Sequence, residues 1–358
     1  MKKYNLLLII LLAFAYQVSA QQLSGYKICI DPGHGGHTSD DRQTPLPHNI
    51  VYWESEGVFE VSHDHLLPML QALGANVKLT RYDNTDGSDI SLSARSTIAN
   101  NYGADFFHSV HTNAGGGDYT LLLFKGYTTN PAYSQAKTMG NIMAPILEEL
   151  HKTVRWFNRG DLTFLGYYLG VLKYANMPST LSECSFHDVD AEGLRLKNHE
   201  YLKNYAWGMA KSFMQYWSKP GFSNGRVGGV VKDASGNPLN GVSVSCEPGG
   251  QTYTGDNYYN GFYAFGDLAP GTYTLTFSKA GYAAYTASVT ISANSYSDLD
   301  ITLQESNIET PTVQTPSANQ SGLNSPVNFT WEMAETQNAD FRIQVSTSAD
   351  GWTPQNGF

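Results

Sequence analysis

The chain is poor in cysteine, in basic residues and in long apolar runs. Three cysteines in 358 residues are too few for a disulfide framework of the kind that holds small secreted domains together. There are 22 lysines and arginines against 32 aspartates and glutamates, which gives a formal net charge of −10. This excess of acidic residues argues against nucleic acid as a partner and against binding to an anionic membrane surface.

The cysteines are Cys29, Cys184 and Cys246. Cys29 and Cys184 lie near the ends of expected strands, which leaves a disulfide between them open. We favour small buried thiols at both positions, because free cysteine is among the most buried residue types. Cys246 lies in a different domain and is expected to stay a free thiol.

One apolar run, Leu6 to Ala15, lies close to the start of the chain. It follows Lys2 and Lys3 and precedes the small-residue cleavage site Val18-Ser19-Ala20, so residues 1–20 are expected to be a signal peptide. The run is too short to span a bilayer as a permanent helix. We therefore expect an exported chain, periplasmic or extracellular, with no membrane span after signal removal.

Strand-like and helix-like segments alternate over residues 21–217. The runs that predict strands are 27–30, 76–80, 105–110 and 179–184. The segments with helical spacing are 60–73, 92–101 and 199–217, of which the first two are closed by Gly74 and Gly103. This alternation predicts an α/β catalytic domain, with a mostly parallel twisted sheet and helices on both faces.

The pattern changes after residue 217. Residues 218–225 are rich in serine, glycine and proline and predict a linker. Residues 226–303 contain short alternating strands between glycine, asparagine and proline turns, which predicts an all-β sandwich. A second linker is expected at 304–326. Residues 327–358 begin another β pattern that is too short to complete a sandwich, so we expect a partial β domain there.

The segment from Ile28 to Gly36 reads I-C-I-D-P-G-H-G-G, a short apolar strand that runs into a glycine-rich turn around His34. His111 lies at the end of a second expected strand, and Glu183 at the end of a third. Because parallel strands place their carboxyl ends at one edge of a sheet, where α/β folds carry their chemistry, these side chains are expected to meet.

Two histidines and a glutamate suit a zinc site. Three protein ligands leave a fourth position for water, as in catalytic zinc sites. The glutamate is Glu54 or Glu56, both in the segment Trp53–Gly57 before an expected helix. Acidic residues are also favoured at a helix N-terminus by the helix dipole, and the residues alone leave the choice open.

Glu183 places a carboxylate at the end of a buried strand, which is costly unless the group is paired or functional. Hydrolysis at zinc needs a carboxylate that accepts the proton released by water. Glu183 is therefore the candidate general base; a glutamate bonded to backbone at a strand end is the alternative.

Several segments of residues 26–217 follow the order of a known family: Asp31–Gly36, Glu54 with Val58–Val61, Leu79–Arg81, Leu92–Arg95, Phe107–Ala114, and Val171 through Pro178 to Glu183–Phe186. Together they resemble the zinc-dependent N-acetylmuramoyl-L-alanine amidases of the amidase-3 type. The second acidic residue that the family has after the glycine pair finds no match in His37–Asp40.

This resemblance implies a zinc ion held by His34, Glu54 and His111, with Glu183 as the catalytic general base. Glu54 is preferred to Glu56 because the hydrophobic residues of the family's helix then coincide with those of this chain. The implied substrate is the amide between N-acetylmuramic acid and L-alanine in peptidoglycan.

Asn113 is expected to contact the substrate, although a role in the local turn fits equally well.

Residues 226–303 resemble carboxypeptidase regulatory-like sandwich modules, through Gly228–Val231, Gly236–Val242, Asn260–Tyr263 and Leu268–Tyr273. They carry no catalytic cluster, so the resemblance implies a spacer or binding role. Residues from Pro326 onward resemble the opening of a fibronectin type III-like domain.

The leading hypothesis is an exported zinc amidase of the cell wall, whose protein partners the sequence does not indicate. A non-catalytic protein for wall binding or surface attachment is the alternative, and the appended sandwich favours it. A zinc peptidase acting on ordinary peptides ranks last, because the chain has no H-E-x-x-H ligand pair.

Overall fold

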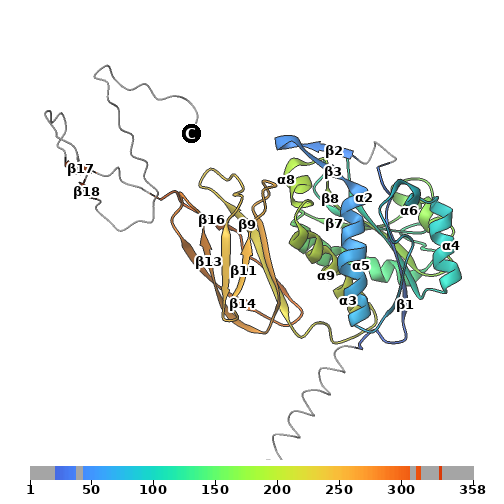
Figure 1. Cartoon of the computed structure of the whole chain (residues 1–358). Helices are drawn as coiled ribbons and strands as arrows, with labels where there is room; N and C mark the ends of the chain where they lie inside the picture. The colour runs from blue at the N-terminus through green and yellow to red at the C-terminus, as the bar shows by residue number, and fades with distance from the viewer. Residues whose placement is uncertain (1–20, 38–42, 307–311, 316–329, 333–358) are drawn as a thin grey trace, which may run out of the picture.

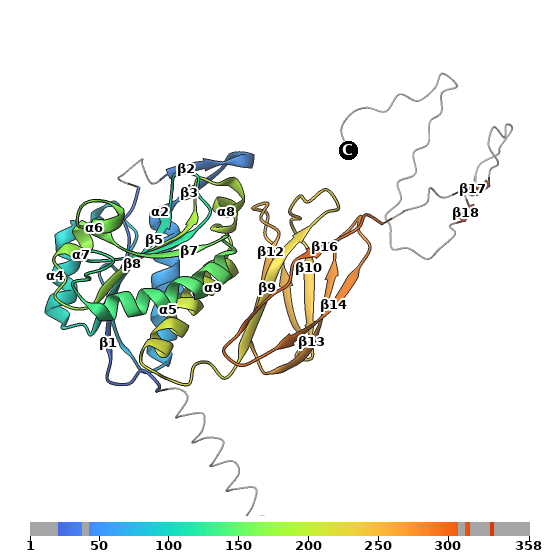
Figure 2. The ribbon, with the colours of Figure 1, turned by 180° about the vertical axis from the view of Figure 1, so that it is seen from behind.

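Six strands of the first domain form one mixed sheet, in the order β4-β1-β5-β8-β6-β7 (Figures 1 and 2). The computed structural model describes residues 21–37, 43–306, 312–315 and 330–332. The strands are β1 (Lys27–Pro32), β4 (Asn76–Leu79), β5 (Phe106–Asn113), β6 (Thr120–Phe124), β7 (Trp156–Gly160) and β8 (Ser179–Phe186). Strands β4, β1, β5 and β8 are parallel, and β6 is antiparallel to β8 and parallel to β7. The predicted mostly parallel sheet is confirmed.

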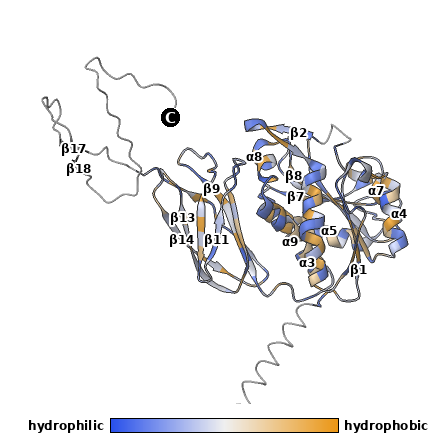
Figure 3. Cartoon of the chain, in the orientation of Figure 1, coloured by the Kyte–Doolittle hydropathy of each residue, from blue (hydrophilic) through white to orange (hydrophobic). Residues whose placement is uncertain are grey.

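Helices cover both faces of this sheet. One face carries α2 (Glu54–Phe59), the π-helix η3 (Glu60–Leu66), α3 (Leu67–Ala72), α5 (Ser134–His151) and α9 (His199–Tyr216). The other carries α4 (Leu92–Tyr102) and α7 (Gly170–Lys173). Alternate residues of β1 enter the two cores, with Ile28 and Ile30 on one side and Cys29 on the other. Figure 3 shows hydrophobic and hydrophilic residues alternating along helices such as α2 and α3, as expected for helices with one face on a sheet.

The cysteines are all free and buried. Cys29 belongs to the core beneath α4 and α7, whereas Cys184 belongs to the core on the opposite face. The sheet itself separates the two thiols, so the disulfide that the sequence left open does not form.

A hairpin of β2 (Gln43–Leu46) and β3 (Ile50–Trp53) precedes the first helix and packs beside α8 (Asp190–Arg195). Its tip is a 3-10 turn, Pro47–Asn49. The helix expected at 60–73 begins at Glu54, directly after β3, and continues through the π-helix to Ala72. The earlier start places Glu54 on the first turn, where the helix dipole favours a carboxylate.

The second domain is a sandwich of two sheets, in the orders β11-β10-β13-β14 and β12-β9-β15. Its strands are β9 (Gly225–Lys232), β10 (Ser243–Glu247), β11 (Gln251–Thr254), β12 (Phe262–Leu268), β13 (Gly271–Ser278), β14 (Tyr285–Ile291), β15 (Tyr296–Asp298) and β16 (Ile301–Thr302). A further pair joins β17 (Thr312–Thr315), inside the expected linker, to β18 (Thr330–Glu332). The predicted signal peptide and most of the predicted partial domain lie outside the described residues.

The sandwich packs on helix α9 through a shared apolar core. Val230 and Phe262 of the sandwich belong to the same buried cluster as Tyr201 of α9. Arg226, which is 2% exposed, bonds from Nε to Asn204 Oδ1 at 2.6 Å and from Nη2 to Glu200 Oε2 at 3.2 Å. The two domains are therefore held together by a buried polar contact inside an apolar interface.

Within the described residues, no helix combines the length and the apolarity that crossing a membrane requires.

We predict that R226A lowers the free energy of unfolding by about 2 kcal/mol, because it leaves buried polar groups of α9 without their donor. Chemical denaturation measures this change. R155A at the exposed Arg155 is the control and is expected to change stability by less than about 0.5 kcal/mol. An R226A variant as stable as this control would show that Arg226 does not stabilise the contact between the two domains.

Candidate metal centre

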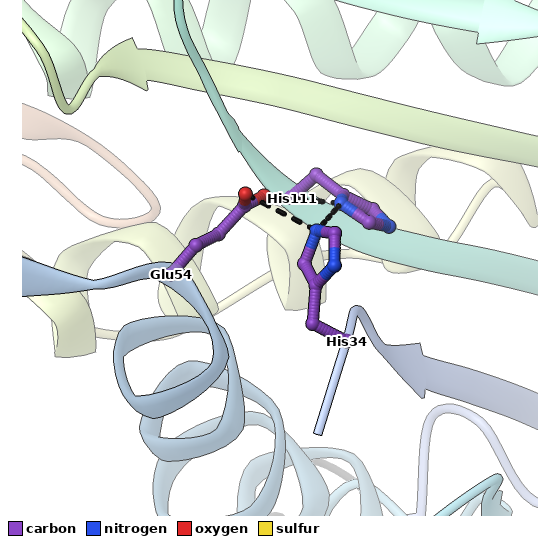
Figure 4. A group of neighbouring side chains, drawn as sticks. All are labelled: His34, Glu54 and His111. Carbon is purple, nitrogen blue, oxygen red and sulfur yellow. Dashed lines mark hydrogen bonds and ion pairs between the residues drawn. The ribbon is translucent and has the colours of Figure 1, made fainter. Parts of the chain in front are cut away.

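Three side chains converge at the carboxyl edge of the sheet (Figure 4). His34 comes from the turn after β1, Glu54 begins α2, and His111 lies on β5. Nε2 of His34 lies 3.1 Å from Glu54 Oε2 and 3.1 Å from Nδ1 of His111, and that Nδ1 lies 3.0 Å from Glu54 Oε1. The structure thus brings together all three residues that the sequence singled out.

The donor set fits zinc. Two imidazole nitrogens and a carboxylate oxygen are ordinary zinc ligands, and tetrahedral bonds of zinc length put neighbouring ligand atoms about 3.3 Å apart. The observed separations of 3.0 to 3.1 Å are close to that value. Among the described residues, this is the one group of three or more potential ligand side chains whose atoms all lie within 4.8 Å of one another.

The two glutamates have different surroundings. Glu54 is 2% exposed and faces both histidines. Glu56 is partly exposed and pairs with His37 Nε2 at 2.9 Å and with Lys197 Nζ at 3.7 Å. Glu54 therefore lies in the cluster, and Glu56 belongs to a surface ion pair.

The cluster holds the Glu54 carboxylate in its ionised form. Burial by itself raises a carboxyl pKa, but hydrogen bonds from His111 and His34 outweigh burial and hold the pKa of Glu54 well below its usual range. The backbone N–H of Thr112 also donates to Oε1 at 2.9 Å. An ionised carboxylate is the form that ligates a metal.

His34 has a left-handed backbone with φ of 56°, an uncommon conformation for a residue with a side chain. Two buried arginines hold the surrounding turn. Arg95 donates from Nη2 to the His34 carbonyl at 2.8 Å, and Arg81 donates from Nη2 to the Gly33 carbonyl at 2.9 Å. These bonds stabilise the conformation that turns the imidazole toward Glu54.

Asp31 holds Arg95 in the position from which it supports the turn at His34. Its fully buried carboxylate accepts hydrogen bonds from Arg95 Nη1 at 2.8 Å and from Ser109 Oγ at 2.6 Å, and also from the Thr80 hydroxyl. Burial raises the pKa of Asp31, but Arg95 and the two hydroxyls outweigh burial and lower the pKa below its ordinary value. The sequence favours a structural role for Arg95 through carboxylates, which these contacts confirm, but it does not identify the partners, because they come from separate segments.

Gly33 leaves room for the ring of His111. A Cβ atom at this position would overlap the His111 imidazole. The glycine is therefore needed here for close approach, since any side chain would displace one of the converging histidines.

Glu183 lies beside the cluster on the neighbouring strand. His111 of β5 and Glu183 of β8 are paired in register. Paired residues of adjacent strands are about 4.8 Å apart and project from the same face of the sheet. Glu183 is half-buried and is not a member of the three-residue cluster.

Asn113 ends β5, two residues after His111. Its side-chain oxygen accepts the backbone N–H of Ala114 at 2.9 Å, a bond within the turn. Its Nδ2 is buried without a hydrogen-bond acceptor among the described residues. The side chain of Asn113 therefore stabilises the local turn, and its Nδ2 donor has no acceptor among the described residues.

Two family models match the chain. The N-acetylmuramoyl-L-alanine amidase model matches residues 28–214, and the carboxypeptidase regulatory-like domain model matches residues 226–304. The N-acetylmuramoyl-L-alanine amidase CwlM of Bacillus licheniformis is 31% identical over 192 residues, which cover 51% of this chain and 66% of that protein. The sporulation-specific N-acetylmuramoyl-L-alanine amidase of Bacillus subtilis (strain 168) is 30% identical over 189 residues, which cover 53% of this chain and 67% of that protein.

This chain thus spans about two thirds of the length of these relatives. Among solved structures, the N-acetylmuramoyl-L-alanine amidase from Clostridium difficile 630 superposes with a TM-score of 0.45 at 24% identity. The superposition covers 55% of this chain and 98% of that one.

We predict that E54A abolishes tight zinc binding, whereas E56A keeps it, because only Glu54 faces the two imidazole nitrogens. The measurement is the zinc content of each purified variant after dialysis against a stated free-zinc buffer. Metal lost from E56A and retained by E54A would show that the other glutamate is the ligand.

A second prediction concerns Asp31. D31N is expected to lower the free energy of unfolding by about 3 kcal/mol at neutral pH, because the buried Arg95 loses its buried carboxylate partner and keeps only the partly exposed Asp89. Folding depresses the pKa of Asp31, so its contribution is complete above the unfolded pKa of about 3.9 and is lost as the pH falls through the lower folded-state value. Urea denaturation at several pH values tests this. The gap between wild type and D31N should shrink below pH of about 4; a gap that widens there would contradict the assignment.

Proposed function

The chain belongs to the N-acetylmuramoyl-L-alanine amidase family, and from that premise we propose that it is an exported zinc hydrolase of peptidoglycan. The bond it cleaves is the amide between N-acetylmuramic acid and L-alanine. The observation that carries this proposal is the cluster of His34, Glu54 and His111, with Glu183 paired in register beside it.

In this proposal, His34 Nε2, His111 Nδ1 and the Glu54 carboxylate hold the zinc ion. When bound, zinc lowers the pKa of a water molecule to about 7 and polarises the scissile carbonyl. The buried, ionised Glu54 and the turn clamped by Arg81 and Arg95 keep the three ligand atoms in place before any ion arrives. Such preorganisation reduces the conformational entropy that the ligand side chains would lose on binding the metal.

Glu183 acts as the general base. Its carboxylate accepts a proton as water adds its oxygen to the carbonyl carbon, and it then delivers that proton to the departing nitrogen of L-alanine. The C–N bond breaks, leaving a carboxylic acid on the muramic acid side, which keeps the second proton of the water, and a free amine on the stem peptide. Asn113, which ends β5 two residues after His111, is proposed to contact the bound substrate.

Peptidoglycan lies outside the cytoplasm, so this function requires export, and residues 1–20 are proposed as the signal peptide. Residues 226–303 are proposed as a sandwich module, joined to the catalytic domain by residues 218–225. Residues 327–358 are proposed as the start of a further β domain after a linker at 304–326.

A non-catalytic wall-binding protein is the second candidate, and the sandwich module is the observation that favours it. The converging ligand set argues against it, because wall binding alone does not call for a buried carboxylate between two imidazoles.

We predict that the purified chain releases intact stem peptides and bare glycan from peptidoglycan, that a chelator abolishes this release, and that added zinc restores it. E183Q should lower the rate by about 100-fold or more while keeping its zinc, since general-base catalysis contributes about 10² to 10⁴. E56Q is the matched control and should retain full activity. Mass spectrometry identifies the products.

Activity that survives complete removal of metal would refute the zinc mechanism. Full activity in E183Q would refute the role of the base. Sedimentation with purified sacculi without any released product would favour the wall-binding candidate.

A further inference from the structure

A cavity of about 480 Å³ lies between the two domains. The tip of the β2–β3 hairpin and helix α8 form its wall on the catalytic side, and residues of β9 with the loops at 236–238 and 259–260 form its wall on the sandwich side. Figures 1 and 2 both show α8 and the hairpin facing the loops at this end of the sandwich. Neither domain could form the cavity alone.

The walls of this interdomain cavity are fixed by polar contacts between the domains. Asn260 is 3% exposed and donates from Nδ2 to the Leu194 carbonyl at 3.2 Å. Asn198, the N-cap of α9, donates from Nδ2 to Asp256 Oδ2 at 2.7 Å and to the Tyr253 hydroxyl at 2.8 Å. These hydrogen bonds fix the two domains on either side of the cavity.

Two cations line the interdomain cavity, one from each domain: Arg195 of α8 and Lys232 of β9. Asp190 is the single carboxylate in the lining. Arg195 forms no ion pair with any described residue; its guanidinium lies over the Tyr201 ring, 5.8 Å from the ring centroid, and its Nε is buried without a hydrogen-bond acceptor. The guanidinium fork of Arg195, which lines the cavity, matches the planar geometry of a carboxylate.

A ring stack closes one side of the cavity. His48 of the hairpin tip and Tyr259 of the sandwich stack with centroids 3.6 Å apart and planes 16° apart. Both residues have left-handed backbones, with φ of 63° and 56°. Such conformations are unfavourable for residues with side chains and persist where the surroundings maintain them, often at ligand clamps.

The interdomain cavity is linked to the metal centre by a short stretch of chain. Strand β3 runs from the stacked turn to Glu54, six residues after His48. Six residues span at most about 20 Å, so one extended polymer can reach both places. The rest of the lining is largely apolar, with Pro47, Leu194 and Val230, and suits small alkyl groups such as alanine methyls.

We propose that this cavity is a second substrate site, which binds a carboxylate of a neighbouring stem peptide while the metal centre acts on another. Naming the ligand as a stem peptide rests on the proposed function. Arg195 and Lys232 supply the positive charge, in a chain whose net charge of −10 otherwise repels anions. The sandwich then contributes directly to recognition of the polymer.

R195Q tests this proposal. R155Q is the control for the change in charge, because Arg155 is exposed and does not line the cavity. Two readouts are used on the full-length protein. The first is the ratio of kcat/KM on polymeric peptidoglycan to kcat/KM on a muropeptide with one stem peptide. The second is calorimetric binding of free stem peptide, which has no scissile amide, compared with the same peptide amidated at its carboxyl groups.

We expect R195Q to lower the kcat/KM ratio by about 10-fold and to lose binding of the acidic peptide, while R155Q matches wild type. The amidated peptide should bind wild type at least 10-fold more weakly than the acid. K232Q is a second variant for the case in which R195Q does not fold, and it should show the same direction of change. Circular dichroism establishes the fold of each variant.

A folded R195Q with an unchanged ratio and unchanged peptide binding would overturn the second site. Equal affinity for the acidic and amidated peptides would overturn carboxylate recognition. If wild type hydrolyses neither substrate, the proposed function fails, and the peptide titration still decides whether the cavity binds carboxylates.

Discussion

The in-register parallel pairing of β1, β5 and β8 is the constraint on which the candidate site depends. It brings the turn after β1 next to His111 on β5, and it sets Glu183 beside His111 on the next strand. A shift of one residue in either pairing would send one of these side chains to the opposite face of the sheet. The chemistry of the site is thus decided by the same backbone hydrogen bonds that build the core.

A buried polar network makes this constraint effective. The Asp31 carboxylate joins strands β1 and β5 to Arg95 of α4, and Arg95 in turn binds the carbonyl of His34. Buried charges are tolerated when they are paired and fully hydrogen-bonded, as here. The same logic holds at the domain interface, where Arg226 connects the sandwich to α9.

Local patterns in the sequence were sufficient to predict the parallel sheet, since the apolar runs and the glycines that follow them are short-range signals. The hairpin β2–β3 was not predicted, because its strands are four residues long, include Pro45 and are stabilised by packing on α8. The bond between Arg95 and Asp31 joins residues 64 apart, and no periodicity reveals such a pair. Glu54 and Glu56 could be distinguished only by resemblance, because their difference in burial depends on tertiary packing.

The central claim is that His34, Glu54 and His111 form a zinc site, and X-ray anomalous scattering at the zinc absorption edge from crystals of the full-length protein tests it most directly. The account predicts one strong peak about 2.0 to 2.2 Å from His34 Nε2, His111 Nδ1 and a Glu54 carboxylate oxygen. Crystals grown with zinc that show no peak between these three side chains, or a peak held by other residues, would contradict it.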